Sequence, residues 1–462
     1  MCEPKYDDTL KYIIRYVYNL KHWYWYSPHV YKRARLALLD SMGCAIETLA
    51  QSLDMRTLIG PVVPGTTIPN GFRLPGTTFV LDPVKGAFDL GTLICYLGHN
   101  GDYPSAEWGR ASDSLGAIVA VADWLSRCYA ADNTIGRPIT LQDVLTAQIQ
   151  ACEIQRALQA DNNLNKRGLD HAILSKIAST AAIARLMRLG EEQALNLLHY
   201  AWQEEHPLQT DRRAPYAGPM KGWAAGNACS RAVHLCFLAM TSRPGMPSVV
   251  TAPVLAVPEW GFGGVLADLM ESEIFIRPAA EAALEIAARL EFNEREVGDI
   301  KQMTITTQYT AKDIMSKTGP LRNRTDRDQC VQYIIAVSLI KGTPIHDEDF
   351  ADDSPWASDP RVDALREKIV IVEDEQVTRA SPIVVELKDG AELSGFEVGF
   401  SVGRPKHSET VDFVEKKFKA NMSKGGFESV TVDTIMRLAQ TNGLAIHHFI
   451  DLFAKEVPYI GS

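Results

Sequence analysis

Several features that would define a protein class are missing from this sequence of 462 residues. It has no uninterrupted apolar run of the roughly 18 residues that a membrane-spanning helix needs, so we expect no membrane partner. The N-terminal stretch carries acidic residues early and lacks the apolar h-region of a secretory signal, so we expect a cytoplasmic location. There is no internal repeat and no low-complexity segment.

Positive charge is also in short supply. The chain has 47 Lys and Arg residues against 57 Asp and Glu residues, a formal net charge of −10. Because no basic stripe with interleaved aromatic residues offsets this balance, the sequence argues against a nucleic-acid partner. The field of the whole protein would not attract an anionic substrate, so the cations that bind one must be gathered locally.

The eight cysteines lack the spacing of a metal or redox centre. There is no C-x-x-C pair, and most of the cysteines lie in apolar helical sequence, which favours buried free thiols. The sequence therefore predicts no iron–sulfur cluster and no metal site. The cysteines are Cys2, Cys44, Cys95, Cys128, Cys152, Cys229, Cys236 and Cys330.

What the sequence does contain, from about Asp7 to Met240, is a succession of helical patterns. We expect Ser112 to be the N-cap of one helix and Gly190 to close another as a C-cap. The stretch Pro61–Pro83 is too rich in proline and glycine for a helix and predicts an extended, looping segment.

The pattern changes near Arg277 to a mixture of helices and strands, with Asp389-Gly390 as a strong hairpin signal. Helical patterns return after Arg404. We therefore predict a mainly α protein with a large all-helical domain, residues 1–268 and 405–462, and a smaller α+β domain, residues 269–404.

One charged loop, GHNGDYPSAEWGRASDSLG (Gly98–Gly116), interrupts the apolar helices. Loops held by rigid neighbours are where binding and catalytic groups tend to lie. A solvated turn that caps the next helix is the alternative interpretation.

Several motifs, spread in order over nearly the whole chain, resemble the MmgE/PrpD family. They are RLALLDSMGCAIETL, AEWGRASDSLGAIVAVADWLSR, GLDHAILSKIAST, RRAPYAGPMKGWAAGNACSRAV, TAPV and GPLRNRTDRDQCVQY. Within the family, the motifs are most similar to those of the 2-methylcitrate dehydratases, and cis-aconitate decarboxylase is a more distant relative.

The resemblance implies an all-helical domain completed by the C-terminal helices, an α+β lid domain, and an active site in the cleft between them. It also implies a homodimer and a dehydration that needs no metal or cofactor. Such a reaction requires cations for the carboxylates of a tricarboxylate substrate, a base for a carbon-bound proton and an acid for the departing hydroxyl.

The charged loop departs from the family pattern, which resembles D-F-N-D-T followed by E-W-G-H-P-S-D. Gly98 and Gly101 stand where two aspartates are expected, and Arg110 stands in the place of the histidine. Asp102 and His99 are each one place from a lost carboxylate and are our candidates to replace it. The matching positions include Asp113 and the candidate substrate-binding residues Glu107 and Ser112. Arg110 is a further substrate-binding candidate.

Two further motifs supply candidate site residues. His171 matches the family's histidine near a helix start, where a structural hydrogen-bonding role is the alternative. Lys221 matches the family's lysine and is a candidate for both catalysis and carboxylate binding, and Arg212 and Arg213 fall where the family has an Arg-His pair. An exposed basic loop is the alternative for these cations.

The lid motif adds Arg322 and Arg327 as carboxylate-binding candidates and Tyr333 as a proton donor or carboxylate ligand. The stretch after TAPV is shorter than in the family, and there is no histidine between His234 and His346. The family histidine of that stretch is therefore absent.

Three functions remain open from the sequence. The first is a dehydratase of a citrate-type acid, extended to a bulkier alkylcitrate of a biosynthetic pathway because small residues at Gly98 and Gly101 would enlarge the pocket. The second is a decarboxylase of an aconitate-type acid. The third is a catalytically impaired homologue that binds a ligand or a partner.

Overall fold

The protein is described here by a computed structural model. It describes residues 8–19, 28–103, 109–133, 136–160, 162, 164, 167–204, 207–208, 219–241, 276–307, 316–343, 345–374, 381–398 and 410–460. Within these ranges no helix combines the length and apolar character that crossing a membrane requires.

The chain divides into two compact units. Unit 1 comprises Met1–Pro207, Gly222–Ser272 and Thr410–Ser462, and unit 2 comprises Leu208–Lys221 and Glu273–Glu409. The domain borders predicted from the sequence, at residues 268/269 and 404/405, lie outside the described residues.

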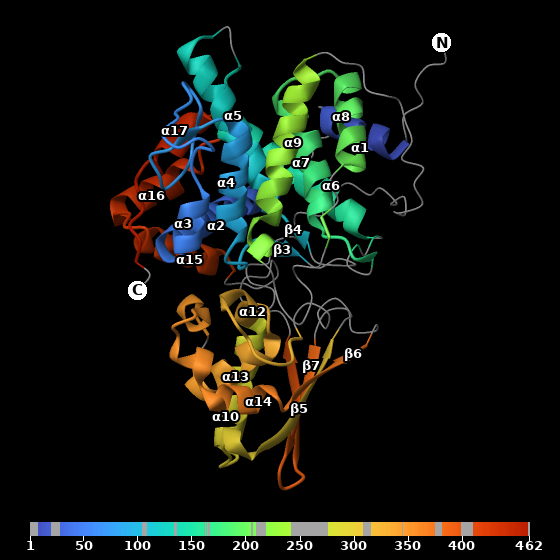
Figure 1. Cartoon of the computed structure of the whole chain (residues 1–462), viewed down its shortest axis with the longest axis vertical. Helices are drawn as coiled ribbons and strands as arrows, with labels where there is room; N and C mark the ends of the chain where they lie inside the picture. The colour runs from blue at the N-terminus through green and yellow to red at the C-terminus, as the bar shows by residue number, and fades with distance from the viewer. Residues whose placement is uncertain are drawn as a thin grey trace. The chain divides into compact units, whose positions relative to one another are not determined.

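Unit 1 is built from helices, as the mainly α prediction requires (Figure 1). In chain order these are α1 (Asp8–Tyr18), α2 (Pro28–Gln51), α3 (Leu53–Leu58), α4 (Pro83–Cys95), α5 (Leu115–Ala131), α6 (Leu141–Ala160), α7 (Ala172–Leu186), α8 (Glu191–Gln203), α9 (Ala224–Met240), α15 (Thr410–Lys424), α16 (Ser429–Leu438) and α17 (Ile446–Asp451). Two short antiparallel ladders accompany them, β1 (Phe72–Arg73) with β2 (Val80–Leu81) and β3 (Asp102–Tyr103) with β4 (Gly109–Arg110).

Glycines let three helices of the core approach backbone to backbone. Helix α4 contacts both α5 and α9. A Cβ atom at Gly91 of α4 would lie 2.9 Å from Cα of Gly226 in α9, and one at Gly116 of α5 would lie 2.6 Å from the Gly91 nitrogen. A side chain at these positions would push the helices apart, so the glycines fix the spacing of the helices that precede and follow the charged loop.

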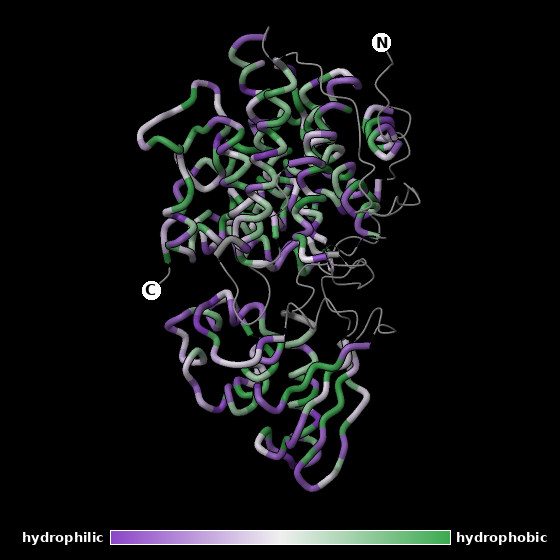
Figure 2. The backbone as a smooth tube through the Cα atoms, turned by 45° about the vertical axis from the view of Figure 1, so that its right-hand side comes forward, coloured by the Kyte–Doolittle hydropathy of each residue, from purple (hydrophilic) through white to green (hydrophobic). Residues whose placement is uncertain are grey.

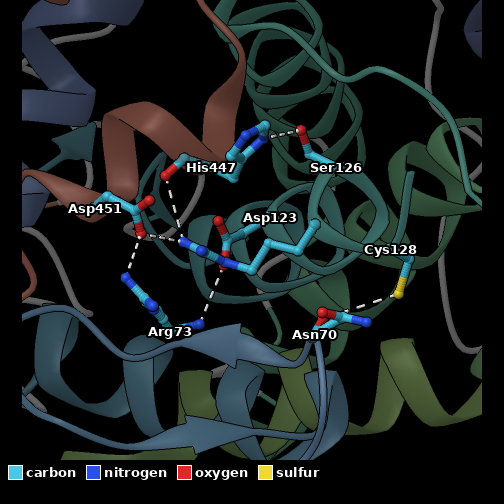
Figure 3. Close-up of polar contacts among 8 residues, drawn as sticks. Asn70, Arg73, Asp123, Ser126, Cys128, His447 and Asp451 are labelled. Atoms are coloured by element: carbon cyan, nitrogen blue, oxygen red, sulfur yellow. Dashed lines mark hydrogen bonds and ion pairs between the residues drawn. The ribbon is translucent and has the colours of Figure 1, made fainter. Parts of the chain in front are cut away.

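Helix α17, near the C-terminus of the chain, is anchored to α5 by a partly buried ion-pair network (Figure 3). The Asp123 carboxylate accepts hydrogen bonds from Arg127 Nε (2.8 Å) and from the Arg73 backbone N–H (3.1 Å). Arg127 Nη2 also donates to Asp451 Oδ1 of α17 (2.7 Å). The side chain of Asp123 is fully buried.

This network predicts a pH dependence of stability. Burial raises the pKa of Asp123 from 3.8 to about 6. The folded state therefore binds a proton more tightly than the unfolded state, and the free energy of unfolding falls as the pH rises through about 6. We expect Asp123 to make the free energy of unfolding about 1 kcal/mol larger near pH 5 than near pH 7. Urea unfolding of Asp123→Asn should lose this difference, whereas the exposed control Asp54→Asn should keep it.

Unit 2 holds a four-stranded sheet of order β6-β5-β7-β8, with β5 parallel to β6 and antiparallel to β7. Helices α10 and α13 pack on each other, and α10 also contacts β8. These helices cover one side of the sheet (Figure 1). Hydrophobic residues, shown in green, are concentrated along the strands of this sheet and in the interior helices of unit 1 (Figure 2). The elements are α10 (Ile276–Phe292), β5 (Ile300–Thr307), α12 (Arg324–Asp328), α13 (Val331–Lys341), α14 (Pro360–Arg366), β6 (Ile369–Glu373), β7 (Ser381–Leu387) and β8 (Glu392–Val398).

The sequence misplaced two helix ends. Ser114, and not Ser112, is the N-cap of α5, because residues 111–114 still form turns after β4. Gly190 is the N-cap of α8 and not the C-cap of α7, which ends at Leu186. The extended Pro61–Pro83 segment and the hairpin at Asp389-Gly390 are confirmed.

Candidate active site

A buried carboxylate and a histidine face each other in unit 1. Asp113 lies in the turn between β4 and α5 and is 1 % exposed. Its Oδ2 is 3.3 Å from His171 Nε2 and accepts a hydrogen bond from Ser175 Oγ (3.2 Å), and its Oδ1 accepts one from Cys95 Sγ (3.3 Å). Burial opposes ionisation of Asp113, but the contacts from His171, Arg110 and Cys95 together outweigh it and lower the pKa of this carboxyl below 3.8.

His171 is placed by the start of α7, where it is the N-cap residue. Ser175, one turn further along the helix, lies on the same face and reaches the same carboxylate. The second ring nitrogen, Nδ1, lies 3.5 Å from Asp170 Oδ1, a carboxylate that also accepts from the Ala172 backbone N–H. The imidazole is thus oriented firmly at Nε2 and more loosely at Nδ1, which suits a group that exchanges a proton.

The first part of the charged loop is a tight turn, and both of its glycines have left-handed backbone angles. Gly98 has φ +74° and Gly101 has φ +64°. A Cβ at Gly101 would lie 2.9 Å from Ser112 Oγ. Backbone conformation and close packing account for glycine at these positions, where the sequence suggested space for a larger substrate.

Arg110 closes this turn. Its guanidinium donates to the carbonyls of Cys95 (3.2 Å) and Gly98 (3.4 Å). The same guanidinium contributes to the lowered pKa of Asp113. Ser112 Oγ is buried and makes no hydrogen bond within the described part of the chain, so a polar ligand atom would satisfy it.

The ring of His99 is engaged elsewhere. It is largely buried, and its Nε2 hydrogen-bonds Glu47 Oε2 of α2 (3.0 Å). Lys424 Nζ donates to the other oxygen of Glu47 (2.6 Å). Although burial opposes ionisation, the contacts from His99 and Lys424 lower the pKa of Glu47 to about 2. We therefore do not assign His99 a role in proton transfer.

In unit 2, Lys221 forms a buried ion pair. Its Nζ donates to Asp328 Oδ1 (2.8 Å), and the two side chains are 4 % and 6 % exposed. Lys221 lies in the short 3-10 turn η4 (Pro219–Trp223), and Asp328 ends α12. Because an ammonium can donate more than one hydrogen bond, the chemistry of Lys221 allows a contact with a substrate carboxylate in addition to Asp328.

Arg327 and Tyr333 make polar contacts within unit 2. Arg327 Nε donates to the Phe350 carbonyl (2.7 Å), and its Nη2 pairs with Asp352. Tyr333 is 2 % exposed and donates its hydroxyl hydrogen to the Asp349 carbonyl (2.8 Å). Burial raises the pKa of Tyr333 well above its ordinary value, which makes it a poor proton donor.

Some predicted site residues cannot be placed. Glu107, Arg212 and Arg213 lie outside the described residues, and Asp102 is described only by its backbone in β3. Arg322 is exposed, and its backbone N–H donates to Asp326 Oδ2 (2.9 Å). Across the described ranges, no group of three His, Cys, Asp or Glu residues is arranged to hold a metal ion.

Comparison with known proteins decides the family. A model of the MmgE/PrpD N-terminal domain matches residues 12–273, and a model of the MmgE/PrpD C-terminal domain matches residues 271–440. This chain belongs to the MmgE/PrpD family.

Curated relatives match this MmgE/PrpD chain along nearly its full length. An alkylcitrate dehydratase from a fungal species is 40% identical over 480 residues, which cover 98% of this chain and 94% of the relative. A 2-methylcitrate dehydratase-like protein of Aspergillus oryzae is 41% identical, with 98% and 97% covered. The 2-methylcitrate dehydratase of Escherichia coli is 36% identical, with 97% and 98% covered.

Sequence reasoning missed part of the arrangement in this MmgE/PrpD chain. Asp113 was noted only as a family match and is the residue that contacts His171. Ser175 and Cys95, which also reach Asp113, were not singled out. The signal for Ser175 was available, because it follows His171 by one helical turn and so shares its face.

Proposed function

We propose that this chain is a hydro-lyase that removes water from a citrate-type tricarboxylic acid, with an alkylcitrate as its substrate. The observation that carries the proposal is the buried contact between Asp113 and His171, 3.3 Å apart. It gives the chain an oriented acid–base group of the kind that dehydration needs. The dehydratases that match the chain over nearly its full length support the same reaction.

We assign the base to His171. Asp113 holds the Nε2 side of the ring and stabilises the imidazolium, so Nδ1 takes the proton from the carbon beside a substrate carboxylate. The electron pair of that C–H bond forms the alkene, and the C–O bond breaks. The departing hydroxyl leaves as water after it receives a proton, for which Asp102 is our candidate.

The cations that hold the substrate carboxylates are proposed to include Lys221, on the basis of its match to the family's lysine and its buried ion pair with Asp328. Arg212, Arg213 and Arg322 are proposed as further carboxylate ligands, and Ser112 as a hydrogen-bonding one. Arg110 contacts the carbonyls of Cys95 and Gly98, so we propose that it shapes the site. Glu107 is proposed as a further substrate-binding residue.

The choice of an alkylcitrate rests on the relatives. Two alkylcitrate dehydratases, 40% and 37% identical to this chain, match 98% of it. The glycines of the turn do not strengthen this choice, because their backbone angles already explain them.

Turnover by the purified chain tests the proposal. Citrate, 2-methylcitrate and a long-chain alkylcitrate should be offered in parallel, with ultraviolet absorbance to detect the new alkene and mass spectrometry to identify the loss. We expect loss of water, fastest from the alkylcitrate. Loss of carbon dioxide would indicate a decarboxylase, and tight tricarboxylate binding without turnover would indicate an impaired homologue.

We also propose that the protein is a cytoplasmic homodimer without a cofactor, as the family resemblance implies. Light scattering on the purified chain should give twice the mass of 51.1 kDa. A mass of one chain would contradict the dimer.

A further inference from the structure

We propose that Lys417 of α15 is a positioning residue for the acid–base site, which it serves by holding the Gly98–Gly101 turn. The inference rests on the proposed function. Lys417 Nζ donates to the backbone carbonyl of His99 and forms an ion pair with Asp40 of α2 (3.0 Å). Its side chain is 9 % exposed and that of Asp40 is 2 % exposed.

The turn that Lys417 holds leads directly to Asp113. The Gly101 carbonyl accepts from the Ala111 backbone N–H (2.7 Å), two residues before Asp113. The Gly98 carbonyl accepts from Arg110 (3.4 Å), the guanidinium that lowers the pKa of Asp113. Lys417 therefore holds a turn whose carbonyls bond Arg110 and Ala111, the residues that lie three and two positions before the Asp113 carboxylate that contacts His171.

Apart from the His99 ring, which reaches Glu47 of α2 (3.0 Å), the other printed contacts of the turn come from nearby in the sequence. Asn100 Nδ2 donates to the Ile94 carbonyl (3.1 Å), and Arg110 reaches Cys95 and Gly98. Lys417 instead lies 318 residues away in the chain. It is a tertiary contact that fixes where the turn lies relative to α2 and α15 within unit 1.

Stability alone does not account for an ammonium at this position. Helix α15 already packs along α2, with Phe418 and Met422 fully buried. A buried ion pair is weak support for a fold, because desolvation of both charges opposes the attraction between them. What an apolar residue could not supply is a donor for the His99 carbonyl.

The variants must distinguish two effects: loss of the contact between Lys417 and the His99 carbonyl, and burial of the Asp40 carboxylate without a partner. Lys417→Met alone would leave the Asp40 carboxylate buried without its ammonium. Asp40→Asn retains Lys417 on the His99 carbonyl, whereas Asp40→Asn/Lys417→Met removes that contact without stranding a carboxylate. Lys419→Met, on the exposed side of the same helix, is the matched control, since Lys419 is 51% exposed in its pair with Asp433.

We expect the double variant to lose about 10- to 100-fold in kcat with KM little changed, because a displaced base slows the chemical step more than binding. Lys419→Met removes only an exposed pair and should remain within about threefold of the unaltered chain. Asp40→Asn, which keeps the donor on the His99 carbonyl, should retain a higher kcat than the double variant. A conservative Lys417→Arg variant, which keeps a donor, should recover most of the rate. A folded double variant with an unaltered kcat would overturn the proposal.

Hydrogen exchange gives a readout that does not depend on turnover. The Ala111 amide, bonded to Gly101, should exchange faster in Asp40→Asn/Lys417→Met than in Asp40→Asn. If the unaltered chain shows no turnover but this exchange differs, the proposed function fails and the positioning contact stands. Equal exchange in the two variants would overturn the positioning role whatever the activity.

Discussion

Replacing His171 with glutamine is expected to lower kcat for alkylcitrate dehydration by about 100- to 10 000-fold. The glutamine amide can still donate to Asp113 and fills a similar volume, so the start of α7 should remain folded. It cannot accept a proton from carbon near neutral pH. Initial rates from the alkene absorbance, together with a circular dichroism spectrum of the variant, measure the effect.

The matched control for this variant is His448→Gln. His448 is exposed on α17, so its replacement should leave kcat within about twofold of the unaltered chain. A His171→Gln variant that turns over nearly as fast as the unaltered chain would remove His171 from the chemistry. The Asp113 contact would then be structural only.

The second large effect is expected for Asp113→Asn, which should lower kcat by about 100-fold or more. In the native pair the carboxylate accepts the Nε2–H of His171 and leaves Nδ1 able to take a proton. An asparagine amide can donate to Nε2 instead, which moves the ring proton to Nδ1 and blocks the base. The loss should appear in kcat over the whole neutral pH range, because the lowered pKa of Asp113 keeps the native carboxylate ionised there.

Asp170→Asn distinguishes the roles of Asp170 and Asp113, the two carboxylates beside the His171 ring. Asp170 lies 3.5 Å from Nδ1 and also accepts from the Ala172 N–H, so its replacement should alter kcat by about tenfold or less. If Asp170→Asn proved far more damaging than Asp113→Asn, the roles of the two ring nitrogens would have to be exchanged.

Much of the fold follows from local patterns. Helical periodicity predicted α2, α7 and α9, and Asp389-Gly390 predicted the β7–β8 hairpin. The errors lie at helix ends. A serine before a helix looks the same in sequence whether it caps the helix or, like Ser112, lies in the turn before it, and the bonds that distinguish the two cases depend on the neighbouring β4 strand.

The site was harder to predict. Motif resemblance offered His171 and Lys221 as candidates, but it could not show that Asp113 lies against His171, because that contact depends on how α5 and α7 pack. It also could not show that His99 faces Glu47, since adjacent residues of a turn point in different directions. The role of Lys417 is visible only in three dimensions, because α15 is remote from the charged loop in the chain.

A structure of the His171→Gln variant with an alkylcitrate bound would examine the assigned base most directly. The residue-171 side chain should lie within contact distance of the substrate carbon that loses its proton, and Lys221 should contact a substrate carboxylate. If the alkylcitrate instead lay away from residue 171, with another side chain beside that carbon, His171 would not be the base.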